Sequence, residues 1–196
     1  MDDNKKFLIV GLGNADNEYS GTRHNIGFEV VNALAQKLDA KFESGRLAYV
    51  AKARYKGRSL VIIMPTTYMN LSGKAVKYWM TQEKIPANAI MVISDDIDLP
   101  VGQLKMKPKG GGGSHNGLGN IIELLGSQDF PRLRVGIGKN YAQGYQVDYV
   151  LGKFTSEDLK LIDPAIQRAC DAILAFTTVG IERAMNAANS AEKQKI

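Results

Sequence analysis

Two histidines, each followed directly by an asparagine, are the side chains in this sequence best suited to acid–base chemistry: His24 and His115. A neutral imidazole accepts a proton near pH 7, and a buried carboxylate such as Asp95 holds such a ring in the required tautomer. Asparagine amides donate N–H groups to a developing oxyanion without adding charge, and the chain offers them at Asn14, Asn70 and Asn116. Each residue alone is more typical of a turn or a cap. The set together suits attack of water on an ester, with His24 as the general base.

Two apolar segments are expected to bring part of this set together. Residues 7–10 form a continuous apolar run that ends in glycine, and residues 89–94 form a second run that leads directly into Asp95 and Asp96. Both runs are typical of buried strands. Because the carboxyl ends of parallel strands meet at one edge of a sheet, we expect Asn14 and Asp95 to lie close together there. His24 follows Asn14 by ten residues of loop and is therefore expected within reach of both.

The rest of the chain alternates helical and strand patterns. Apolar residues at every fourth position from Ile26 predict an amphipathic helix, with Asn25 as its N-cap and His24 directly before it. Residues 155–158 resemble a capping box that opens a helical tail, in which Pro164 should start a new helix or kink the first. Further predicted elements are a hairpin of 47–55 and 59–64, helices over 72–83 and 118–125, and strands over 103–107 and 133–137.

These elements predict an α/β fold: a single-domain sandwich with a mixed, mostly parallel, twisted sheet and helices on both faces. We expect one domain over residues 1–196, ordered over about 6–188, because the 196-residue length fits one core and no linker is visible. No apolar run reaches about 18 residues, so no membrane span is expected. Cys170 is the single cysteine, which excludes an intrachain disulfide, and a cytoplasmic location is the default expectation.

Positive charge is concentrated in one segment. Between residues 103 and 139, six basic residues face two acidic ones, so this segment carries +4 of the chain's net +5. Such a concentration is typical of a phosphate-binding face. Lysines on an edge strand also prevent pairing between sheets, and charge alone favours neither reading. The basic residues are Lys105, Lys107, Lys109, Arg132, Arg134 and Lys139.

Several familiar sites are absent or weak. The glycines from residue 11 begin like a dinucleotide fingerprint, but Asp16 occupies its last position and would repel a pyrophosphate. The glycine run at 110–113 lacks the lysine of a P-loop, and Ser114 lacks the final glycine of a nucleophile elbow. Cys170 is expected to pack in the core. An acidic group at 95–98 is weak evidence for magnesium, and no histidine pair at metal-binding spacing is present.

Six ordered blocks of the sequence resemble the bacterial-type peptidyl-tRNA hydrolase family. The resemblance spans roughly residues 7–185 and therefore most of the chain. Its motifs are far more specific together than any one alone. The blocks are Gly-Leu-Gly-Asn from 11 with Tyr19 and the run 22–28, then 67–73, 95–102, 115–118, 132–138 and 149–154.

The resemblance implies release of a peptide from tRNA by hydrolysis of the ester to the terminal ribose. By position, His24 would activate water, Asp95 would hold His24 in its basic form, and Asn14 would sense the blocked amine of the substrate. His115 would support the site. The family implies no metal and no cofactor, a monomer, and a role in translation. Residues implied to line the site for the peptide and the tRNA end are Tyr19, Tyr68, Asn70 and Asn116.

The candidates for holding acceptor-stem phosphates are Lys105, Lys107 and Arg134. The chain also departs from the family pattern without losing any proposed chemical group. Two alternatives remain open: an RNA-binding relative that does no chemistry, which intact His24 and Asp95 disfavour, and a nucleotide-binding Rossmann enzyme. The departures are Ala15-Asp16 after the first asparagine, Met64, Ser114 and Gly119.

Overall fold

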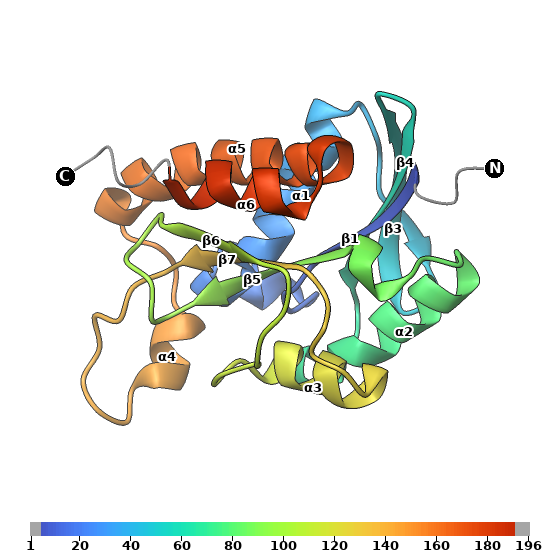
Figure 1. The fold of residues 1–196 in the computed structure, drawn as a ribbon. Coiled ribbons are helices and arrows are strands. Elements are labelled where there is room, and N and C mark those ends of the chain that lie inside the picture. The colour runs from blue at the N-terminus through green and yellow to red at the C-terminus, as the bar shows by residue number, and fades with distance from the viewer. Residues whose placement is uncertain (1–4, 191–196) are drawn as a thin grey trace.

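A seven-stranded mixed sheet forms the centre of the computed structural model, which describes residues 5–190 (Figure 1). Its strand order is β2-β3-β4-β1-β5-β7-β6. The four central strands are parallel: β4 (Arg58–Pro65), β1 (Lys6–Gly11), β5 (Ile90–Asp96) and β7 (Arg132–Gly136). The flanking strands pair antiparallel: β2 (Glu43–Gly45), β3 (Ala48–Tyr55) and β6 (Leu104–Lys107).

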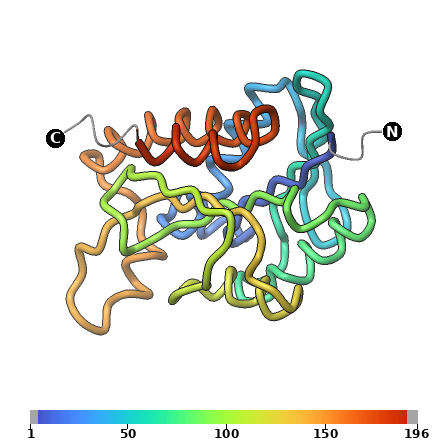
Figure 2. Tube along the Cα trace, in the orientation of Figure 1, coloured from blue at the N-terminus to red at the C-terminus, as the bar shows by residue number. Residues whose placement is uncertain are grey.

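Helices cover both faces of this sheet, which confirms the predicted α/β sandwich. Figures 1 and 2 show α1, α5 and α6 on one face and α2 and α3 on the other, with α4 beyond the edge of the sheet. Their bounds are α1 (Ile26–Lys37), α2 (Ser72–Gln82), α3 (Asn116–Leu125), α4 (Gln146–Val150), α5 (Ser156–Val179) and α6 (Ile181–Ser190). Short 3-10 turns are η2 (Asn17–Tyr19), η3 (Arg23–Asn25), η4 (Met69–Leu71) and η5 (Ala87–Ala89).

All strands except β2 form where the sequence patterns predicted them, whereas the exposed β2 was not predicted. β1 is buried from Phe7 to Gly11, as expected of a central strand covered on both faces. The predicted hairpin is β3 and β4, joined by Lys56 and Gly57, both with positive φ. That backbone matches the twist of the strands it connects. The sequence therefore predicted the sheet through burial and the hairpin through turn chemistry.

The start of α1 packs unusually close to the end of β1. A Cβ on Gly11 would lie 2.4 Å from the Gly27 carbonyl oxygen, and one on Gly27 would lie 2.5 Å from the Leu12 carbonyl oxygen. Only glycine permits this approach. Gly11 at the end of β1 and Gly27 in α1 thus serve chain packing rather than a dinucleotide, and they bring the turn before α1 against the carboxyl ends of β1 and β5.

Pro164 does not start a new helix. It lies inside α5, which runs without interruption from Ser156 to Val179 behind the predicted capping box of Thr155 and Asp158. Proline in a helix interior costs about 3 kcal/mol. Buried Ile162 and residues 165 and 169 place apolar contacts on both sides of the proline, and this packing keeps the helix continuous.

Among the described residues, no helix has the length and apolar character needed to cross a membrane. The expectation of disorder in the last few residues concerns 191–196, which lie outside the described residues.

Candidate active site

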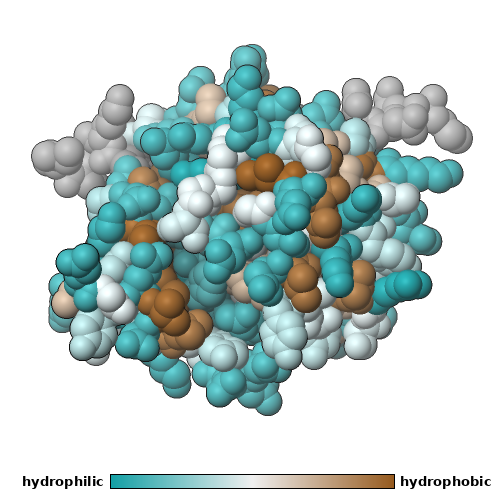
Figure 3. Space-filling view, turned by 90° about the horizontal axis from the view of Figure 1, so that it is seen from below, coloured by the Kyte–Doolittle hydropathy of each residue, from teal (hydrophilic) through white to brown (hydrophobic). Residues whose placement is uncertain are grey.

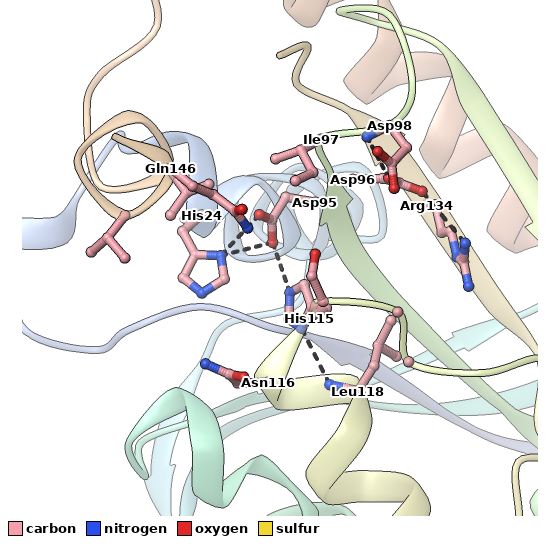
Figure 4. Close-up of a pocket in the computed structure, with 15 residues that line it drawn as sticks. His24, Asp95, Asp96, Ile97, Asp98, His115, Asn116, Leu118, Arg134 and Gln146 are labelled. Atoms are coloured by element: carbon pink, nitrogen blue, oxygen red, sulfur yellow. Dashed lines mark hydrogen bonds and ion pairs between the residues drawn. The ribbon is translucent and has the colours of Figure 1, made fainter. Parts of the chain in front are cut away.

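His24 and Asp95 meet at the carboxyl edge of the sheet, as the strand-end argument predicted. Asp95 is the sixth residue of β5, and His24 lies in the turn η3 just before α1. The His24 Nδ1 is 2.9 Å from Asp95 Oδ2 and 3.0 Å from Oδ1 (Figure 4). An ionised carboxylate only accepts hydrogen bonds, so Nδ1 carries the proton. The other ring nitrogen, Nε2, therefore keeps a lone pair that can accept a proton.

His115 is a second imidazole on the same carboxylate. Its Nε2 lies 2.8 Å from Asp95 Oδ1, and its Nδ1 accepts the Leu118 N–H at 3.2 Å as the N-cap of α3. Because Nδ1 is an acceptor, Nε2 must carry the proton and donate to Asp95. Asp95 thus receives an N–H from each histidine. The sequence indicated only that His115 supports the site, because nothing in it shows the direction of a capping side chain.

Burial and hydrogen bonding shift these pKa values in opposite directions. Burial raises the pKa of the Asp95 carboxyl, but the fields and hydrogen bonds of His115 and then His24 lower it by more, so it lies well below the ordinary value. Burial lowers the pKa of His24, whereas the hydrogen bond and charge of Asp95 raise it and prevail. Asp95 therefore stays ionised, and His24 is a stronger base than an unpaired histidine.

These residues open into a pocket of about 130 Å³. Asn116 lies on the α3 side of it, and Gln146 from α4 lies beside His24 (Figure 4). Val147 and Val150, also from α4, complete this wall. The α4 wall carries a functional contribution that sequence reasoning missed, since a five-residue helix with no buried residue gives no periodic signal.

Asn14 is held by a reciprocal pair of hydrogen bonds from Asn25. The Asn25 Oδ1 accepts the Asn14 N–H at 2.8 Å, and its Nδ2 donates to the Asn14 carbonyl at 2.9 Å. Asn25 occupies the N-cap position of α1, but its side chain makes no capping bond, so the predicted capping role is wrong. Asn25 instead fixes the backbone of Asn14 next to the turn that carries His24.

Of the polar residues predicted to line the site for the substrate, Asn116 lines this pocket, whereas Tyr19, Tyr68 and Asn70 do not. Asn70 lies in η4, which packs on the start of α3, where a Cβ on Gly117 would meet Met69 Sδ at 2.7 Å. Tyr68 precedes η4 and is 75% exposed. Tyr19 is the last residue of η2, and its backbone carbonyl accepts a hydrogen bond from the Thr22 hydroxyl. Within residues 5–190, no hydrogen bond is made by the side chains of Asn14, Asn70 and Asn116. Their amides are therefore available to a ligand.

Arg23 fastens α4 to the turn that carries His24. Its Nη1 donates to the Tyr149 carbonyl at 2.9 Å, and its guanidinium lies 4.0 Å from the centre of the Tyr149 ring. Its Nη2 is 3.6 Å from the Asp158 carboxylate, and its backbone N–H donates to Gly152. Sequence reasoning missed this residue, because its partners lie more than a hundred positions away.

The predicted basic residues gather on one side of the site. Lys105 and Lys107 on β6 stand opposite Arg134 and Arg132 on β7, so the four share one face of the sheet. The neighbouring cations, Lys105 first, lower the pKa of Lys107 together with burial. Arg134 reaches the pocket, 3.5 Å from Asp96 Oδ2. Lys105, Lys107 and Arg134 are called the basic cluster below.

Arg132 is not part of the basic cluster, although it is one of the six basic residues of the segment 103–139. It is fully buried and donates to the carbonyls of Gln128, Phe130 and Gly111. Burial and the charge of Arg134 lower the pKa of Arg132 to about 10. Its guanidinium supports the glycine-rich loop that leads to His115, because carbonyl acceptors replace its lost water.

The two histidines form a spatial pair that the sequence search for metal motifs did not find. The candidate ligand atoms of His24, Asp95 and His115 lie within 4.8 Å of one another. Their separations of 2.8–3.0 Å are hydrogen-bond lengths, and the tautomers derived above direct protons rather than lone pairs at Asp95. The geometry is that of a hydrogen-bonded triad, and the absence of a metal stays a prediction.

The comparisons with known proteins agree with this geometry. Residues 8–195 match the family described as peptidyl-tRNA hydrolase. The chain is 52% identical to the peptidyl-tRNA hydrolase of Cytophaga hutchinsonii over 185 residues, covering 94% of this chain and 98% of the relative. The identity to that of Porphyromonas gingivalis is 49% over 184 residues, covering 94% and 100%.

A solved structure gives the same answer for the fold. The crystal structure of peptidyl-tRNA hydrolase from Acinetobacter baumannii superposes with a TM-score of 0.90 at 34% identity, covering 95% of this chain and 96% of that one. The sequence, the fold and the histidine–aspartate pair therefore lead to one conclusion: the chain belongs to the peptidyl-tRNA hydrolase family and has that family's hydrolase activity.

Proposed function

We propose that His24 removes a proton from water, which attacks the ester between the peptide and the terminal ribose of tRNA. The observation that carries this proposal is the hydrogen bond from His24 Nδ1 to Asp95, since it leaves Nε2 as a base. His115 donates a further hydrogen bond to the same carboxylate, at Oδ1. In this mechanism the ribose oxygen leaves with a proton, and the products are a free peptide acid and a reusable tRNA.

The asparagine amides supply the remaining chemistry in this proposal. Asn116 borders the pocket, and Asn70 lies next to it through the packing of η4 on α3. Amide donors at such positions stabilise a developing oxyanion, each by about 10²–10³-fold in rate. Asn14 has the role of sensing the acylated amine of the substrate, which the clamp from Asn25 supports. Tyr19 and Tyr68 are proposed to border the peptide.

The tRNA end is proposed to reach the site from the basic cluster. Arg134 connects the two, because it lines the pocket and shares a sheet face with Lys105 and Lys107. A lysine face that only protected a sheet edge would not extend into a pocket. This continuity favours phosphate binding over edge protection.

The test is hydrolysis of N-acetyl-phenylalanyl-tRNA by the wild type and by His24→Ala. General-base catalysis contributes about 10²–10⁴-fold, so the variant should lose that factor in kcat while it still binds deacylated tRNA. Equal rates in both proteins would refute the proposal. Tight tRNA binding by a wild-type protein without any ester cleavage would instead favour the RNA-binding relative.

The chain is further proposed to act as a cytoplasmic monomer without metal. The triad geometry supports the last point, because its protons occupy the directions that a metal would need. Dialysis against a chelator should leave kcat unchanged, and a loss that zinc restores would overturn this part. Light scattering at micromolar concentration should give the 21.4 kDa mass of one chain.

A further inference from the structure

An apolar groove lies on the opposite side of the active site from the basic cluster. Its floor and walls come from α2, the end of α3 and the turn between β2 and β3. Figure 3 views the molecule from the side of α2, α3 and α4, where apolar patches are separated by hydrophilic side chains. The groove is lined by Leu47, Lys74, Lys77, Tyr78, Thr81, Gln82 and Leu124.

Leu47 is held in this groove on an unfavourable backbone. Its φ is +63°, a conformation that large side chains rarely adopt and that costs on the order of 1–3 kcal/mol. Its carbonyl accepts the Thr66 N–H at 2.9 Å, and the carbonyl of Arg46 accepts the Trp79 indole N–H at 2.8 Å. Arg46 also lies over the Tyr78 ring at 5.1 Å. The turn is thus fastened from two sides, and a half-buried leucine stands where glycine or asparagine would relieve the strain.

The chain that leaves β4 connects the groove with the residues proposed to contact the substrate. Thr66, bonded to the Leu47 turn, lies two residues before exposed Tyr68. Asn70 lies two residues before the start of α2. Lys74 and Lys77 lie on the first turns of that helix. The groove therefore lies along α2, and the segment before that helix carries Tyr68 and Asn70.

The order of the strands shows where the groove and the basic cluster lie relative to the site. His24 and Asp95 lie at the ends of β1 and β5, the basic cluster lies beyond them on β7 and β6, and the groove lies on the β4–β3 side. With the acceptor stem proposed for the basic side, the groove on the other side is available to the peptide.

The positive charges beside the groove predict which peptide sequences it favours. Lys74 and Lys77 are exposed and have no salt bridge within residues 5–190, and no acidic residue lines the groove. We propose that the groove is a subsite for the peptide part of the substrate, taking an apolar side chain against Leu47, Tyr78 and Leu124 beside an acidic residue near the two lysines. This inference rests on the proposed function.

The reach of the groove defines which peptide residues it takes. A helix rises about 1.5 Å per residue, so Tyr78 lies roughly 9 Å along α2 from its start. An extended peptide covers about 3.3 Å per residue. The length of α2 up to Tyr78 alone takes about three extended residues, and further residues are needed to reach α2 from the ester. We therefore expect residues about four to six positions from the ester to enter the groove, and a single N-acetylated amino acid not to reach it.

The experiment compares three substrates on one tRNA: N-acetyl-Phe, and two hexapeptides ending in the same Phe, Ac-Leu-Asp-Leu-Gly-Gly-Phe and Ac-Leu-Lys-Leu-Gly-Gly-Phe. An exposed ion pair contributes about 0.2–1 kcal/mol, so the wild type should favour the acidic hexapeptide by about 1.4- to fivefold in kcat/KM. Lys77→Glu should reverse this preference. Leu47→Asn, which tolerates the positive φ, should reduce the advantage of both hexapeptides over N-acetyl-Phe.

The control is Lys160→Glu, which makes the same charge change on an exposed helical lysine of α5. It should keep the wild-type preference. Equal kcat/KM for the two hexapeptides in the wild type would overturn the subsite. So would an equal shift in the control, or a matching loss of deacylated-tRNA binding in Lys77→Glu, which would indicate RNA contact instead. Failure to hydrolyse N-acetyl-Phe-tRNA would contradict the proposed function itself.

Discussion

Asp95 organises the site at the level of single residues. It is almost fully buried, yet two imidazole N–H groups keep it ionised and fix both ring tautomers. The charge of Asp95 makes His24 more basic, whereas burial alone would make it less basic. The base strength of His24 is therefore a property of the pair.

Asp95→Asn tests this dependence. An amide in place of the carboxylate removes the charge that raises the pKa of His24 and leaves burial, which lowers it. The acid limb of the kcat/KM profile should move to lower pH, with kcat reduced by about 10²–10⁴-fold. An unchanged limb with a small loss of rate would show that Asp95 does not control the base.

Asn25 offers a second residue-scale prediction. Asn25→Ala leaves the Asn14 N–H and carbonyl without their partners, and an unsatisfied buried group costs about 1–3 kcal/mol. Thermal unfolding should occur at lower temperature, and kcat/KM for N-acetyl-Phe-tRNA should approach that for unblocked Phe-tRNA. Asn25→Asp, which keeps the acceptor for Asn14 N–H, should retain more of both properties. If Asn25→Ala kept the wild-type preference for N-acetyl-Phe-tRNA over unblocked Phe-tRNA, the proposed role of Asn25 in positioning Asn14 would be contradicted.

At the scale of elements, α4 is the part of the pocket with the weakest attachment. It has no buried residue, and its described anchors centre on Tyr149. The hydroxyl of Tyr149 donates to the Ile137 carbonyl at 2.6 Å, and its carbonyl and ring hold Arg23. The wall next to His24 therefore depends on one arginine adjacent to the base.

Arg23→Lys should loosen this wall without touching the triad. A lysine keeps the charge but loses the planar fork and the stacking on Tyr149. KM for N-acetyl-Phe-tRNA should rise by about tenfold, while the pH dependence of kcat stays that of the wild type. Protease cleavage within residues 139–146 should become faster. A shifted pH profile with unchanged KM would place Arg23 in control of the base and contradict this account.

At the scale of the whole molecule, the sheet separates two surfaces around one edge. The basic cluster on β6 and β7 is on one side, and the apolar groove by α2 is on the other. The parallel strands β1 and β5 end between these two surfaces, and the side chains of the site lie at those strand ends. A substrate with a polyanionic and a peptide part fits this division.

Salt dependence tests the basic side. Each phosphate contact contributes about 0.7–0.9 to the slope of log affinity against log salt. Lys107→Ala should reduce the slope by about that amount. Gly119→Lys should increase it, because Gly119 lies on the first turn of α3 with no atom within 4 Å of an added Cβ. Lys160→Ala is the control, and the same slope in all variants would reduce the cluster to edge protection.

The sequence predicted most of this architecture for physical reasons. Apolar runs need burial, so every strand except the exposed β2 was predicted, and strand direction then placed Asp95 near His24. The rest depended on side-chain directions that sequence does not show. Arg132 is buried because loop carbonyls surround it, Asn25 turns from its helix toward Asn14, and α5 continues through Pro164 because its neighbours are packed. Family resemblance supplied the substrate, which no composition or periodicity contains.

The pH profile of kcat/KM for N-acetyl-Phe-tRNA, measured for the wild type and His24→Gln, tests the central claim most directly. Activity requires neutral His24, whose pKa is raised by Asp95, so the wild-type rate should rise with pH through a limb above the ordinary histidine value of about 6.5. His24→Gln should lose that limb and most of the rate. A limb of the same position and height in His24→Gln would show that another group is the base.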